Sequence, residues 1–234
     1  MGFKIGKTKA KSYNNYKYFP EDKNELSIIV YDRIKKNKDA DLNDIDVSNI
    51  TDMSHLFDGL DPHNINISDW DVSNVKDMYH MFYMCNNFNS NISNWDVSNV
   101  TDMGMMFYEC TNFNGDLSGW NVSGVKNMEN MFEYCNEFKG KGLEKWNVSR
   151  VTNMRFMFYM CDNFNSDISK WNVSNVKDVY KMFQYCKEFE YDLSDWKLNV
   201  PEKNTENMFG FCFKMQELKK WPKWYDVGDD LHLL

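Results

Sequence analysis

The feature that most constrains this chain is an internal tandem repeat of about 25 residues. Successive Trp residues lie 25, 25, 26, 25, 25 and 25 residues apart, and Phe and Cys recur with the same step in a constant register. A unit of this length cannot bury its own apolar face, so neighbouring units must stack around a shared core. We therefore predict three columns of structural core residues: Trp70, Trp95, Trp120, Trp146, Trp171, Trp196 and Trp221; Phe82, Phe107, Phe132, Phe158, Phe183 and Phe209; and Cys85, Cys110, Cys135, Cys161, Cys186 and Cys212.

The apolar spacing inside one unit predicts a short helix and a short extended segment. The apolar residues between 100 and 110 are spaced 3, 3, 1 and 3 residues apart, which matches one face of an α-helix. Ser98 precedes them in the position of a helix N-cap. Trp120 and Val122 then alternate across one residue, which is typical of a strand. The predicted fold class is an α/β repeat solenoid in which each turn contributes one short strand and one short helix.

The chain divides into four regions around this repeat. Residues 1–19 are basic and are expected to form a flexible leader. Residues 20–43 are expected to supply an N-terminal capping helix and a lead-in, because Pro20 can open a helix and the apolar residues after it share one helical face. Residues 44–221 hold about seven repeats of 25–26 residues, and residues 222–234 are expected to form a C-terminal cap or tail.

Composition and charge exclude several classes of function. The chain has 27 Lys and Arg against 35 Asp and Glu, a net charge of −8, which is unsuited to binding nucleic acid or anionic membranes. No apolar run approaches the ~20 residues needed for membrane insertion. Since the sequence shows no secretory signal peptide, a cytoplasmic location is expected as the sequence stands. The alternative is the cell surface, if an upstream export signal was removed.

No arrangement of residues points to catalysis, a metal or a cofactor. The histidines form no HExxH motif, and only His55 and His80 lie one repeat apart. The cysteines form no CxxC pair, so buried free thiols are expected rather than a zinc site or disulfides. Asp116, Asp167 and Asp192 recur in turns, where bonds to their own backbone are expected and calcium binding stays the alternative. We predict a protein that is not an enzyme and holds no cofactor or metal.

Large side chains on the outer side of the predicted helices form a candidate partner-binding surface. In a helix, the residue after each core Phe points about 150° away from the core face, and the residue three positions earlier also points outwards. Exposed aromatic and Met side chains in a line mark protein interaction surfaces. The candidate residues are His80, Tyr83, Met105, Tyr108, Phe156 and Tyr159.

The repeat units resemble those of a known family. The segments DISKWNVSNVKDVYKMFQYC and NISNWDVSNVTDMGMMFYEC resemble the BspA-like bacterial surface-protein repeats, a leucine-rich-repeat-like group. The stretch YKYFPEDKNELSIIVYDRI resembles the N-terminal cap of such proteins. The resemblance implies a leucine-rich-repeat-like solenoid with a protein-binding or adhesive role, and it supplies no catalytic residues.

Two functional hypotheses follow from the sequence. The first is a non-enzymatic, protein-binding solenoid that serves as an interaction scaffold. The alternative is a bacterial surface adhesin, or a lipoprotein-type repeat unit, whose export signal is absent here. The sequence leaves open the identity of the partner protein, the binding face, the source organism and the oligomeric state.

Overall fold

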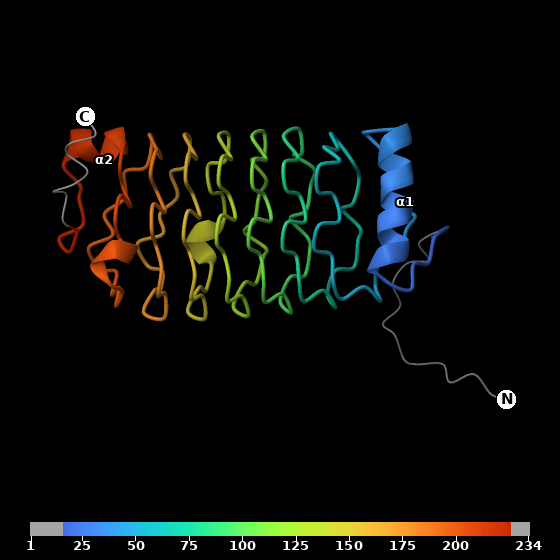
Figure 1. Ribbon diagram of the computed structural model, residues 1–234, viewed down its shortest axis with the longest axis horizontal. Coiled ribbons are helices and arrows are strands. Elements are labelled where there is room, and N and C mark those ends of the chain that lie inside the picture. The colour runs from blue at the N-terminus through green and yellow to red at the C-terminus, as the bar shows by residue number, and fades with distance from the viewer. Residues whose placement is uncertain (1–15, 226–234) are drawn as a thin grey trace.

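The computed structural model describes residues 16–225, which form a single row of stacked rungs, each rung being one repeat unit (Figure 1). The helix α1, Lys23–Lys36, lies at the N-terminal end of the row, and α2, Phe213–Leu218, lies at the C-terminal end. Two short 3-10 helices, η1 (Leu143–Lys145) and η2 (Glu202–Asn204), lie within the row. Most of the predicted leader and tail, residues 1–15 and 226–234, falls outside the described residues.

The predicted α/β repeat solenoid is wrong. Residues 100–110, predicted as a helix, fold as consecutive turns, and between residues 16 and 225 there is no named strand and no sheet. Successive rungs are instead joined by isolated parallel bridges: Asp52 to Asp77, Asp77 to Asp102, Asp102 to Asn127, Asn127 to Asn153, and Asn153 to Asp178. Nor does any helix in the described part combine the length and the apolar character that crossing a membrane requires.

Two kinds of backbone hydrogen bond explain why no helix forms. The N–H of Met106 donates to the carbonyl of Met103 at 3.3 Å and closes a turn inside the rung. The N–H of Phe107 instead donates to the carbonyl of Met131 in the next rung at 2.9 Å. An α-helix would direct both N–H groups to carbonyls four residues back. Apolar residues spaced by three share a face in either arrangement, so the spacing alone could not separate them.

Residues with left-handed backbone produce the alternation. In the rung of residues 103–110, Met105 has φ 53° and Glu109 has φ 56°. Each reverses the local path of the chain, so that alternate N–H groups face the neighbouring rung. The Met105 position recurs in seven rungs with φ between 53° and 60°: His55, His80, Met105, Asn130, Phe156, Lys181 and Asn207.

The Trp, Phe and Cys columns lie inside the stack. The Trp side chains of the column, from Trp70 to Trp196, are at most 5% exposed, and the Phe and Cys columns are buried. The indole N–H of Trp120 donates to the carbonyl of Ile92, and the thiol of Cys110 donates to the carbonyl of Phe82, both at 3.0 Å. Equivalent bonds repeat along both columns, so each rung satisfies a buried carbonyl of an earlier rung.

The Trp column ends differently from the prediction. Trp221 lies 25 residues after Trp196, as the sequence repeat requires, but it is only partly buried. Its indole does not take part in the series of bonds that the other Trp residues make. Trp224 takes that role, because its indole N–H donates to the carbonyl of Leu193 at 2.9 Å. The ring of Tyr225 packs edge to face on Phe209, with centroids 4.9 Å apart, and helps to cover this end of the core.

The helix α1 covers the other end of the core. The carboxylate of Asp22 accepts the N–H groups of Asn24 and Glu25 at 2.8 and 3.0 Å, which caps the helix N-terminus. Three apolar residues of one face, Leu26, Val30 and Ile34, are fully buried. An end helix of this kind is needed because an open stack would expose its core to water.

Candidate functional site

Partly exposed aromatic side chains form a continuous line along one face of the stack. Neighbours from successive rungs have ring centroids 4.5 to 5.8 Å apart, some stacked and some edge to face. Contacts at these distances hold each ring against the next and limit its rotation. We call this line the aromatic row: Tyr83, Tyr108, Tyr134, Tyr159, Tyr185 and Phe211.

The row draws on two neighbouring positions of the repeat. Tyr83, Tyr108 and Tyr159 directly follow a buried Phe, whereas Tyr134 and Tyr185 come two residues after one. The later position has left-handed backbone, with φ 62° at Tyr134 and 67° at Tyr185. The turn therefore brings side chains from both positions to the same face. In an α-helix the two positions would point about 100° apart, which is why the sequence analysis missed Tyr134 and Tyr185.

The six candidate residues from the sequence are all partly exposed, and the structure divides them into two groups. His80 stacks on Tyr83 with centroids 4.3 Å apart, and Tyr83 stacks on Tyr108 at 4.8 Å. Met105 belongs to this group, since its sulfur lies 2.7 Å from Nε2 of His80.

The second group is Phe156 with Tyr159, whose rings meet edge to face at 5.5 Å. Tyr134 joins the two groups, because it contacts both Tyr108 and Tyr159. The guanidinium of Arg155 lies 4.7 Å from the ring centre of Phe156 and 4.3 Å from that of Tyr180. The sequence analysis missed Arg155 and Tyr180, for which no single repeat column gave a signal.

A buried acid lies beside the middle of the row. Glu133 occupies the position directly after a core Phe, where three other rungs carry Tyr, and it is 7% exposed. Burial raises the pKa of Glu133 to about 7, with Glu109 and Glu129 adding to the rise, while a hydrogen bond from the Asn130 amide opposes it. Burial, followed by the charges of Glu133 and Glu109, raises the pKa of Tyr108, whose hydroxyl therefore stays protonated.

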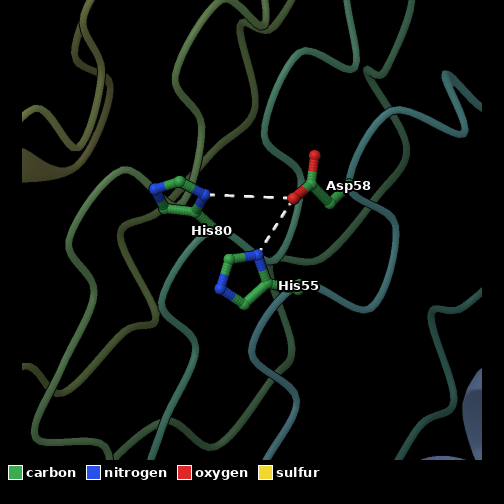
Figure 2. Close-up of side chains that lie close together, drawn as sticks. All are labelled: His55, Asp58 and His80. Atoms are coloured by element: carbon green, nitrogen blue, oxygen red, sulfur yellow. Dashed lines mark hydrogen bonds and ion pairs between the residues drawn. The ribbon is translucent and has the colours of Figure 1, made fainter.

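A cluster of two histidines and an aspartate adjoins the N-terminal end of the row (Figure 2). Nδ1 of His55 lies 2.9 Å from Oδ2 of Asp58, and Nδ1 of His80 lies 4.0 Å from the same oxygen. Burial lowers the pKa of His80, the charge of His55 lowers it further, and Asp58 opposes both. The sequence analysis assigned no metal ligands, yet these three residues offer ligand atoms within 4.8 Å of one another.

The recurring aspartates and cysteines satisfy structural bonds. Asp116, Asp167 and Asp192 each accept the N–H of the Ser two residues later, at 2.9, 3.1 and 2.8 Å. The six cysteines, all in the described part of the chain, are buried thiols outside any disulfide. Burial raises the pKa of five of these thiols: Cys85, Cys110, Cys135, Cys161 and Cys186.

These features define a class of protein: a stack of turn-built rungs, closed by end helices, with aromatic side chains displayed along one face. A family described as "Mycoplasma protein of unknown function, DUF285" matches residues 26–143 and 126–226. The chain belongs to this family. The match is compatible with a bacterial surface repeat family, whereas the BspA-like leucine-rich-repeat assignment stays a prediction. No curated protein and no solved structure matches the chain.

Proposed function

We propose that this protein is a non-enzymatic binding module that holds another protein along the aromatic row. The observation that carries the proposal is the continuity of the row over successive rungs. Tyr and other large aromatic side chains supply much of the binding energy of protein interfaces. Because these rings already pack on one another, little side-chain freedom remains to be lost when a partner binds.

The regular spacing and the charge of the row support an extended, basic partner segment. Parallel rungs repeat at about 4.8 Å, so the row offers aromatic contacts at short, regular steps along a line. Glu109 and Glu129, both partly exposed, lie near its middle, in a chain with a net charge of −8. Lys and Arg side chains of a partner would meet both these carboxylates and the faces of the Tyr rings.

A role at a bacterial surface is a second part of the proposal. The sequence resemblance to BspA-like surface repeats favours an adhesive module displayed on a cell, and the family match is compatible with it. Labelling intact cells that express the full-length product with a membrane-impermeant reagent tests this. Labelling only after lysis would contradict the surface role and favour an interaction scaffold inside the cell.

The binding proposal is tested with Tyr108→Ala and Tyr159→Ala in the full chain. Partners captured by the unchanged protein are assayed against each variant, and we expect a loss of about 30-fold or more in affinity, as for other aromatic anchors. Tyr31→Ala is the matched control, because Tyr31 is exposed on α1 and lies away from the row. Circular dichroism must show that the variants remain folded.

Full binding by both row variants would contradict the proposal. The site would then lie on another side of the stack, where Asp167 and Lys170 are both exposed. Changes at those two positions would be the next to assay.

A further inference from the structure

The backbone places His55, Asp58 and His80 together. His55 and His80 occupy the same left-handed position in successive rungs, with φ 60° and 58°. The N–H of His55 donates to the carbonyl of Tyr79, the neighbour of His80, at 2.9 Å. The N–H of Asp58 donates to the carbonyl of His55 at 3.3 Å and closes the same turn. The cluster is therefore built by the rung geometry.

The side chains converge on one point (Figure 2). Both histidines direct Nδ1 toward Oδ2 of Asp58, at 2.9 and 4.0 Å, and the three ligand atoms lie within 4.8 Å of one another. A tetrahedral zinc ion with bonds of about 2.0–2.1 Å needs ligand atoms roughly 3.3 Å apart. The side chains of His55 and Asp58 are 47% and 35% exposed, so small rotations can bring the three atoms to that spacing.

The ring of His80 is held in the orientation that a metal ligand needs. Its Nε2 lies 2.7 Å from the sulfur of Met105, which can only accept, so the ring proton belongs on Nε2. Tyr79 and Tyr83 pack on the ring, with centroids 4.2 and 4.3 Å away. The Nδ1 lone pair of His80 therefore faces a carboxylate oxygen of Asp58. Two acceptors that face one another repel, and a cation bound between them would remove this repulsion. Outer contacts of this kind orient histidine ligands in metal sites.

We propose that His55, Asp58 and His80 bind one divalent transition-metal ion, for which Zn²⁺ is the natural probe. Two imidazole nitrogens and one carboxylate oxygen form a ligand set that suits Zn²⁺ and its neighbours, whereas Ca²⁺ and Mg²⁺ prefer oxygen ligands throughout. Three protein ligands leave a fourth position for water or for a group from outside the chain. This inference does not depend on the protein-binding proposal.

The test is calorimetric titration of Zn²⁺ into the full chain without a histidine tag. We expect one ion per chain, and at least about 100-fold weaker binding in His55→Gln and in His80→Gln, since even outer contacts of metal sites change affinity 10- to 100-fold. His63→Gln is the matched control, because His63 lies outside the cluster, and it should bind as the unchanged protein does. Excess Ca²⁺ should not displace the ion.

A second readout identifies the ligand atoms. In nitrogen-15 imidazole spectra, Zn²⁺ should shift Nδ1 of His55 and of His80 and leave the signals of His63 unchanged. If His80→Gln does not fold, the exposed His55→Gln variant carries the test alone. The inference is overturned by the absence of one-to-one binding, by unchanged affinity in His55→Gln, by an equal loss in His63→Gln, or by competition from Ca²⁺.

Discussion

Replacing Glu133 by Gln should remove a pH-dependent loss of stability that this buried carboxyl group imposes on the stack. Glu133 is 7% exposed, and its closest polar partner is the amide of Asn130. The substitution keeps the size and shape of the side chain. The position also accepts Gln, because Gln184 occupies the equivalent place directly after Phe183 and is 4% exposed.

The magnitude follows from the raised pKa. Burial lifts the pKa of Glu133 from 4.5 to about 7, so the folded protein favours the neutral acid. Its contribution to stability is therefore fully present below about pH 4.5 and declines as the pH rises to about 7. At ~1.4 kcal/mol per pH unit the full loss would be about 3 kcal/mol. Because water reaches part of the group and screens it, we expect about 2 kcal/mol.

The assay is urea denaturation followed by Trp fluorescence, at about pH 4.5, about pH 6 and about pH 8. The free energy of unfolding of Glu133→Gln, relative to the unchanged protein, should rise by about 2 kcal/mol across this range. Glu137→Gln is the control, since Glu137 is exposed, and its difference should stay flat. Parallel pH profiles for the unchanged protein and Glu133→Gln would show that ionising Glu133 does not destabilise the fold.

Three further outcomes are expected. Trp120→Ala should lower the free energy of unfolding by about 3–5 kcal/mol, because it opens a cavity and leaves the carbonyl of Ile92 without its indole donor. Trp221→Ala, which lies outside that series of indole bonds, should cost less. An unchanged urea midpoint for Trp120→Ala would contradict the assignment of Trp120 to the core. The buried thiols should react with a thiol reagent only as the protein unfolds, whereas rapid labelling of the native protein would show that they are accessible. Asp22→Ala should cost about 1 kcal/mol through the lost N-cap of α1, and equal denaturation curves would argue that the cap contributes nothing.

The sequence alone indicated which side chains lie next to one another in successive rungs. Trp120 and Trp146 are one repeat apart in the chain, and their rings stack with centroids 6.4 Å apart. Phe107 and Phe132 show the same relation at 5.5 Å. A repeat that must stack to bury its apolar residues places like residues over like, so the period alone indicates which side chains become neighbours.

The sequence did not indicate the secondary structure of a rung. Apolar residues three apart, such as Met103 and Met106, share a face in an α-helix and also in consecutive turns. What separates the two is the destination of each N–H group, and half of the acceptors belong to the next rung, as the bond from Phe107 to Met131 shows. That acceptor exists only after the rungs have stacked, so no local pattern contains it.

The candidate site divides in the same way. The exposed column that contains Tyr83 and Tyr108 could be found from its spacing after the core Phe, but Tyr134 joins the row only because left-handed backbone turns its side chain to that face. The shared period of His55 and His80 was visible in the sequence, yet their meeting at Asp58 required the tertiary structure. Sequence spacing determines which residues recur from rung to rung. The turns, which depend on hydrogen bonds between rungs, decide which of those side chains converge.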